Sequence, residues 1–144
     1  MTIAIINTDM DIGPFKIPGN GQNMILNNYA ERNKITVEEI IPEPFKSNAL
    51  ATTIWTHKKK KLSKVILCSI HQLPQERKRL KDLLNYMSGV EFHFALENIS
   101  GSGKKFLKSC VMEAKIFKNA EIIDSSKTSW SQLYKLKIKY EKTP

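Results

Sequence analysis

Two short apolar segments, each followed by a polar cluster, constrain the fold of this chain more than any other feature. They cover residues 64–68 and 90–96, and one amphipathic stretch of helical length, residues 75–88, separates them. This arrangement predicts a strand, a helix and a second strand in succession. Ligands of open α/β sheets bind at the carboxyl ends of the strands, so a site is expected among the polar residues that follow the two segments.

The rest of the chain also alternates between strands and helices. The predicted elements are strands at residues 2–8 and 35–41, a helix that ends near Asn33, helices at residues 47–57 and 104–119, and a half-exposed strand at residues 134–140. This order predicts the α/β class, as a single three-layer α-β-α domain with a mostly parallel sheet and a C-terminal edge strand.

Three local patterns add detail to this outline. Residues 9–21 form a loop rich in Gly and Pro, and a loop of this length is often functional. In the helix predicted at residues 47–57, Trp55 is expected on the apolar face with Leu50 and Ile54. The Ser-Gly repeat at residues 100–103 predicts a flexible loop.

The chain is strongly basic, with a net charge of +9 and a pI of about 9.6. This balance favours anionic partners such as nucleic acid, nucleotide sugars, phosphates or a membrane surface. Much of the charge falls in runs, of which residues 57–61 (HKKKK) are the densest, and runs of this kind are typical of solvated loops and helix faces. A nucleic-acid groove usually interleaves basic residues with exposed aromatic side chains, and no such pattern stands out in the sequence.

Several classes of protein are disfavoured. No apolar run is long enough to cross a bilayer, and the N-terminus has the pattern of a buried strand rather than a signal peptide. Cys68 and Cys110 are predicted to be buried free thiols, and their spacing gives no metal motif. These features favour a cytoplasmic protein. Neither a dinucleotide fingerprint nor a P-loop is present, and the glycine pair at residues 19–21 favours a tight turn over a phosphate cradle.

The layout of residues 3–100 resembles the catalytic domain of serine recombinases, the resolvase and invertase group. The first strand with its long loop, the strand at residues 65–68 and the segment at residues 89–94 carry this resemblance. It implies one resolvase-like domain over residues 1–144, with a core at 2–123 and a C-terminal extension at 124–144.

The chemistry of that family is not matched. Its arginine and nucleophilic serine follow the first strand, where this chain has Asn-Thr-Asp at residues 7–9. Its Asp-Arg-Leu-x-Arg motif is replaced by His-Gln-Leu-Pro-Gln at residues 71–75. The arginines that would neutralise a scissile phosphate are absent from both places, so recombination chemistry is not expected.

A second resemblance, over about residues 13–99, is to a family of sporadic proteins of bacterial surface-carbohydrate gene clusters. It rests on the order and spacing of several short pieces: Phe15-Lys16-Ile17-Pro18, Gln22-Asn23, Tyr29, Asn33, Glu43, Ser69, Gln72-Leu73-Pro74 and residues 91–97. The chain departs from this pattern after residue 100, where it is longer and more basic. The resemblance implies a link to polysaccharide or unusual-sugar biosynthesis, with no particular reaction.

The candidate site follows from the polar residues near predicted strand ends. His71 is a candidate acid/base and Glu97 a candidate base or hydroxyl anchor, while the proposed substrate-binding residues are Lys16, Gln22, Asn23, Gln72 and His93. Most of these residues have a simpler alternative role. His71 could be a helix cap or a surface residue, and His93 a structural or exposed residue. Glu97 could form a loop hydrogen bond, and Gln22 and Asn23 could be N-terminal caps. A metal set of His71, His93 and Glu97 is not demanded by the spacing, and no cofactor is indicated.

Three functions remain open. The favoured hypothesis is a cytoplasmic enzyme or accessory subunit of surface-carbohydrate biosynthesis that acts on an anionic small molecule, such as a sugar phosphate or nucleotide sugar. The alternative is a nucleic-acid-binding protein with a degenerate recombinase-like fold. The third is a non-catalytic homodimer that uses the helix at residues 104–119 and the strand at residues 133–140.

Overall fold

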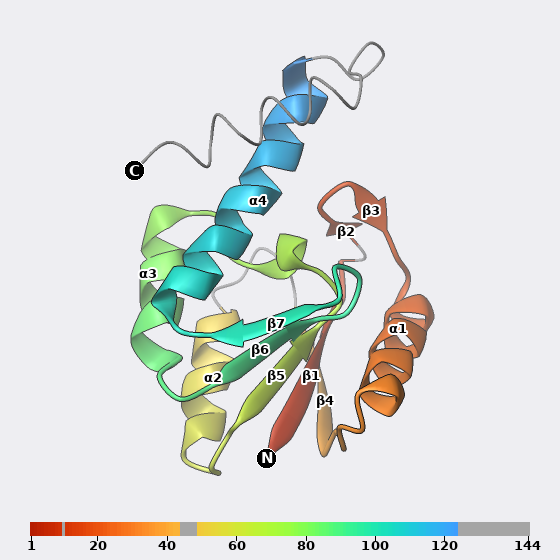
Figure 1. Ribbon diagram of the computed structural model, residues 1–144, viewed down its shortest axis with the longest axis vertical. Helices are drawn as coiled ribbons and strands as arrows, with labels where there is room; N and C mark the ends of the chain where they lie inside the picture. Colours follow the sequence, from red (N-terminus) through yellow and green to blue (C-terminus); the bar gives the residue numbers. More distant parts are fainter. Residues whose placement is uncertain (10, 44–48, 124–144) are drawn as a thin grey trace.

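The computed structural model describes residues 1–9, 11–43 and 49–123 (Figure 1). Its elements, in chain order, are β1 (Thr2–Asn7), β2 (Asp11–Ile12), β3 (Phe15–Lys16), α1 (Gly19–Arg32), β4 (Glu39–Glu43), α2 (Ala49–Lys58), β5 (Lys64–Leu67), the 3-10 turn η1 (Ile70–Gln72), α3 (Arg77–Tyr86), β6 (Glu91–Phe94), β7 (Ile99–Ser102) and α4 (Lys104–Ile123). The edge strand predicted at residues 134–140 lies outside the described residues.

A five-stranded sheet with the order β4-β1-β5-β6-β7 forms the centre of the molecule. The first four strands are parallel, and β7 runs antiparallel to β6. The predicted α/β class with a mostly parallel sheet is therefore confirmed. The central parallel strands β1, β5 and β6 are largely buried and mainly apolar because both faces of the sheet are covered there, whereas the edge strand β4 is largely exposed.

Strand β7 corrects the prediction of a flexible loop at residues 100–103. The chain reverses after Phe94, with Asn98 at a φ of 54°, and Ile99 then pairs with Phe94. Gly101 packs against the ring of Phe106, and a Cβ atom built at this glycine would lie 2.8 Å from two atoms of that ring. The glycine therefore makes room for an aromatic side chain, which composition alone does not reveal.

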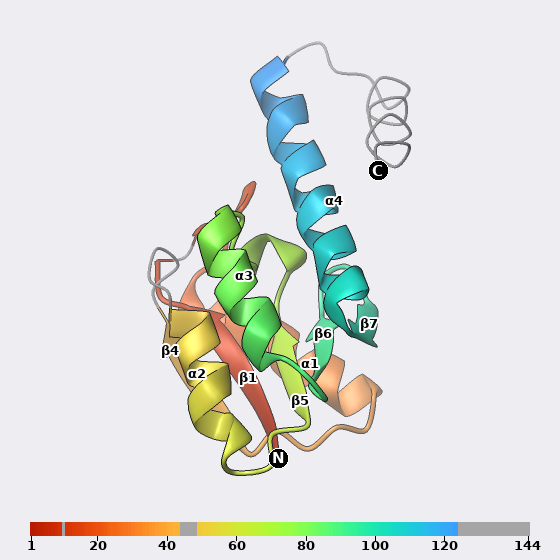
Figure 2. The same cartoon turned by 90° about the vertical axis from the view of Figure 1, so that its left-hand side faces the viewer.

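Helices cover both faces of the sheet. Helices α2, α3 and α4 lie on one face, and α1 lies on the other (Figures 1 and 2). The larger core, beneath α2, α3 and α4, contains the fully buried Phe92 and Phe94, and the smaller core beneath α1 contains Leu26 and Tyr29. None of the helices in the described ranges has both the length and the apolar character that spanning a bilayer requires.

The carboxyl ends of the strands lie under a second layer of structure. The long loop after β1 forms the small antiparallel hairpin β2–β3, and η1 follows the end of β5. Helix α4 passes over η1 and extends beyond the sheet (Figures 1 and 2). Three elements distant in sequence therefore converge at the edge where the sequence predicts a site.

Candidate functional site

The side chain of Gln22 links the end of β1 to the start of α1 through hydrogen bonds. Its side chain is fully buried, its Oε1 accepts from the backbone N–H of Asn7 at 2.7 Å, and its Nε2 donates to the carbonyls of Asn7 and Ile17, each at 2.8 Å. All three contacts are to the protein's own backbone. The amide predicted to position a substrate thus satisfies buried polar groups that would otherwise be left unpaired.

Gln72 has a corresponding role after β5. Its Oε1 accepts from the backbone N–H groups of Cys68 at 2.7 Å and Ser69 at 3.2 Å, and the Ser69 hydroxyl accepts from the N–H of His71 at 3.2 Å. This reciprocal capping box starts η1 and fixes the direction in which the chain leaves the sheet.

Glu97 joins the turn after β6 to η1. Its carboxylate accepts a hydrogen bond from the backbone N–H of Ile70. Burial raises the pKa of the Glu97 carboxyl above its usual value, and the hydrogen bonds from Ile70 and Ser69 oppose this shift only in part. Glu97 therefore binds the backbone of the residue that directly precedes His71.

His71 is the point at which the hairpin, η1 and α4 meet. Its side chain is buried, and its ring contacts Phe15 of β3 and Phe117 of α4 edge-to-face, with centroid distances of 6.1 and 5.9 Å. The backbone of Gly13, in the hairpin turn, also packs directly against this ring. A surface role for His71 is therefore wrong, and the residue packs three separate elements together.

The side chains of the other three candidates have different surroundings. His93 is buried under α1, where its Nδ1 lies 2.7 Å from the hydroxyl of Tyr29 and its Nε2 lies 2.7 Å from Oε1 of Glu91. Burial lowers the pKa of the His93 imidazole. Lys16 is exposed on the hairpin, and Asn23 on α1 has a buried Oδ1 that accepts no hydrogen bond from the described residues.

The structure therefore brings four of the seven candidates, Gln22, His71, Gln72 and Glu97, to the carboxyl edge of the sheet. The side chains of Gln22, Gln72 and Glu97 form hydrogen bonds with backbone groups, and the ring of His71 packs against aromatic rings. The catalytic roles of His71 and Glu97 and the binding roles of the other five residues remain predictions.

Neither cysteine is a candidate nucleophile. Both thiols are free and buried, as the sequence predicts. Burial, with a smaller contribution from nearby carboxylates, raises the pKa of Cys68 and of Cys110 to about 12. At neutral pH both therefore remain thiols, the unreactive form.

The raised pKa of Glu97 predicts a pH-dependent effect of Glu97→Gln. A carboxyl whose pKa is higher in the folded state than in the unfolded state stabilises the fold when protonated, and this stability is lost as the pH rises from about 4.5 through the folded pKa. Glutamine keeps an oxygen that can accept from Ile70 but carries no charge. We expect Glu97→Gln to be more stable than the wild type at pH 7 and to lose this advantage near pH 4.

Urea unfolding of both proteins between pH 4 and pH 8 measures this effect. Glu76→Gln is the control, because Glu76 is exposed and its carboxylate lies 3.2 Å from the guanidinium of Arg79 on the surface. If the stability difference between Glu97→Gln and the wild type is the same at both ends of the pH range, the buried carboxylate is not the cause.

Comparison with known proteins shows the fold. No protein-family model matches the sequence, and no curated protein sequence matches it either. Among solved structures, the chain is similar to the N-terminal catalytic domain of TP901-1 integrase, with a TM-score of 0.56, 17% identity, and coverage of 84% of this chain and 99% of that one. It is also similar to a resolvase family site-specific recombinase from Streptococcus pneumoniae, with a TM-score of 0.50, 13% identity, and coverage of 85% and 91%.

These comparisons confirm the resolvase-like fold and overturn the main functional hypothesis. The solved structures that share the fold are recombinase domains, and no family model supports the assignment to surface-carbohydrate clusters. The surface-carbohydrate interpretation is therefore wrong. That interpretation rested partly on Gln22 and Gln72, which match the pattern of the carbohydrate-cluster family. The side-chain amides of both residues bind the protein's own backbone.

The exposure of Trp55 differs from the prediction. Trp55 was expected in the core with Leu50 and Ile54, but it is 47% exposed, and Nζ of Lys59 lies 4.5 Å from the centroid of its ring. Leu50 and Ile54 are buried as predicted, and Ala51 completes the buried face of α2. The spacing of Trp55 and Lys59, four residues apart on a helix, is the pattern that could have revealed this contact.

Proposed function

We propose that this protein binds nucleic acid through a recombinase-like domain that does not carry out recombination. The observation that carries the proposal is the combination of this fold with a net charge of +9. The structural neighbours are named as an integrase and a site-specific recombinase, and site-specific recombination is a reaction of DNA. A fold of this kind with a large positive excess suits a polyanionic partner.

Positive side chains are exposed on three helices or their ends. They comprise residues 58–61 after α2, Arg77, Lys78 and Lys81 on α3, and Lys104, Lys105, Lys108 and Lys115 on α4. Lysines of this kind neutralise phosphates and release counterions without reading the sequence. The proposal therefore predicts binding whose affinity depends strongly on salt and weakly on base sequence.

The residues at the end of β1 are evidence against cleavage of a DNA strand. The resemblance to serine recombinases places a nucleophile and an arginine here, but the chain has Asn7, Thr8 and Asp9. The backbone of Asn7 is held by Gln22, and the backbone N–H of Asp9 donates to Oδ1 of Asn7 at 2.8 Å. Ser69, near the end of β5, is fully buried and caps η1. These contacts support binding without a covalent step.

Fluorescence anisotropy with labelled DNA and RNA, single-stranded and duplex, tests the proposal. We expect binding at about 50 mM salt that weakens by roughly a factor of 10³ or more at about 200 mM, as expected for six or more phosphate contacts. Supercoiled plasmid incubated with the protein is expected to keep its topology. Absence of binding to every probe at low salt would remove the proposal, and relaxation of the plasmid would contradict the loss of chemistry.

A further inference from the structure

An exposed tryptophan lies beside the densest run of lysines. Trp55 is in the last turn of α2, and the ammonium of Lys59 lies 4.5 Å from its ring centroid, a cation–π contact. Nearly half of the side chain is accessible. The ammonium of Lys59 covers part of the indole ring of Trp55. The accessible part of the ring is an apolar surface that can contact a planar ligand.

The lysine run is an ordered turn. Helix α2 ends at Lys58, and two backbone hydrogen bonds then close the turn, from Lys60 N–H to the His57 carbonyl at 2.9 Å and from Lys61 N–H to the Lys58 carbonyl at 3.1 Å. The side chains of the four lysines at residues 58–61 are exposed, and the ammonium group of Lys59 lies against the ring of Trp55.

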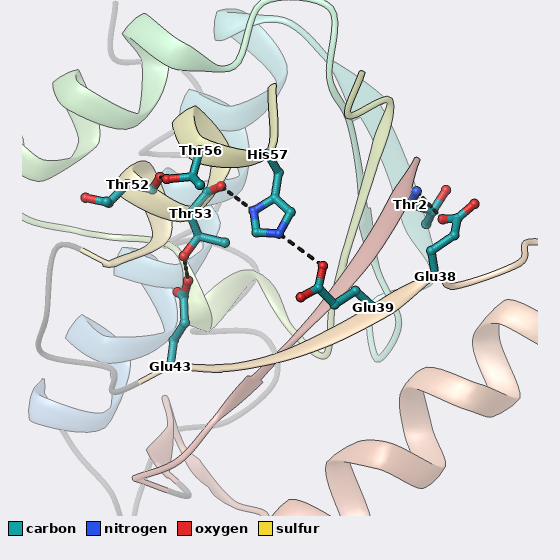
Figure 3. Close-up of polar contacts among 8 residues, drawn as sticks. All are labelled: Thr2, Glu38, Glu39, Glu43, Thr52, Thr53, Thr56 and His57. Carbon is teal, nitrogen blue, oxygen red and sulfur yellow. Dashed lines mark hydrogen bonds and ion pairs between the residues drawn. The ribbon is translucent and has the colours of Figure 1, made fainter. Parts of the chain in front are cut away.

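The inner side of α2 is anchored to the edge strand β4 (Figure 3). Nδ1 of His57 lies 2.8 Å from the carbonyl of Thr53, and its Nε2 lies 3.2 Å from a carboxylate oxygen of Glu39. The hydroxyl of Thr53 donates to the carboxylate of Glu43. The carboxylates of Glu39 and Glu43 thus contact His57 and Thr53, on the side of α2 that faces β4.

We propose that Trp55 and the lysines at residues 58–61 bind single-stranded nucleic acid, with one base stacked on the indole and the neighbouring phosphates on the ammonium groups. The inference rests on the proposed function and names the site and the form of nucleic acid that it takes. An unpaired base can place its face against an aromatic ring, whereas the bases of a duplex are already stacked on each other. This site is at the amino end of β5, away from the edge with His71.

The test uses the full chain with Trp130 replaced by Phe, so that Trp55 is the fluorophore that remains. An oligothymidylate of about 12 nucleotides, close to the site size of a single-strand-binding module, is titrated at low salt. We expect quenching of the Trp55 emission, reversal of the quenching by added salt, and weaker binding of a duplex of the same length.

Two substitutions separate stacking from simple burial. Trp55→Phe keeps an aromatic face, and Trp55→Leu keeps only apolar bulk. Since the side chain is half exposed, both variants are expected to fold, which circular dichroism checks. We expect Trp55→Leu to weaken oligothymidylate binding about 10-fold or more, measured by anisotropy, and Trp55→Phe to retain most of it. Lys59→Gln is expected to reduce the dependence of affinity on salt.

Each other outcome has a definite meaning. If nucleic acid binds but Trp55→Leu binds as tightly as the parent, or the duplex binds more tightly than the single strand, this site is wrong and the proposed function stands. If no nucleic acid binds, both fall. If the oligonucleotide leaves the fluorescence unchanged while anionic phospholipid vesicles shift the emission to the blue, the patch is a membrane-contact surface and the inference is overturned.

Discussion

Replacement of Gln22 by methionine is expected to destabilise the protein by about 3–5 kcal/mol, because three buried backbone groups lose their partner and each such loss costs about 1–3 kcal/mol. Methionine keeps the length of the side chain but cannot accept from the N–H of Asn7 or donate to the carbonyls of Asn7 and Ile17. Since domains of this size are stable by only about 5–15 kcal/mol, such a loss brings the protein close to unfolding.

Chemical unfolding in urea, followed by circular dichroism, measures this loss. Asn27→Met is the matched control, because Asn27 is exposed on the same helix and the substitution gives α1 the same new residue. We expect the control to change the stability by about 0.5 kcal/mol or less. A loss for Gln22→Met that is no larger than that of the control would show that the amide does not support the carboxyl edge.

The role of Gln22 illustrates how far the sequence could predict the site. Strand ends and polar clusters correctly located the edge at which Gln22, His71, Gln72 and Glu97 gather, because the carboxyl ends of parallel strands meet on one side of a sheet. Whether an amide there faces a ligand or the backbone depends on its side-chain direction. A buried glutamine that holds its own main chain and one that holds a ligand have the same sequence pattern.

The fold was more predictable than the site because it depends on periodicity, which is local. The apolar runs of β1, β5 and β6 and the amphipathic α3 all lie where the sequence predicts them. Strand β7 was missed because its Ser-Gly composition suits a loop, whereas the strand is defined by its pairing with β6, and Gly101 packs against the ring of Phe106. The exposure of Trp55 was missed for a related reason, because helical spacing does not distinguish the centre of an apolar face from its border.

A second prediction concerns the contact between the hairpin and His71. Gly13 has a φ of +58°, and a Cβ atom at this position would lie 2.4 Å from Cγ and 2.6 Å from Nδ1 of His71. We expect Gly13→Ala to destabilise the protein by about 2–4 kcal/mol, because it combines the cost of a left-handed backbone with overpacking against a buried ring. The hairpin that carries Phe15 and Lys16 then has to move away from η1.

Gly89→Ala separates these two costs. Gly89 also has a positive φ, +78°, but no atom lies within 4 Å of the Cβ position, so only the backbone cost of about 1–2 kcal/mol applies. A double-mutant cycle of Gly13→Ala with His71→Ala supplies the decisive comparison, since removal of the ring is expected to relieve the overpacking. If Gly13→Ala costs no more than Gly89→Ala, and the cycle shows no coupling, then the hairpin does not depend on His71. Coupling would show that the loop after β1 and η1 depend on the contact between Gly13 and the ring of His71.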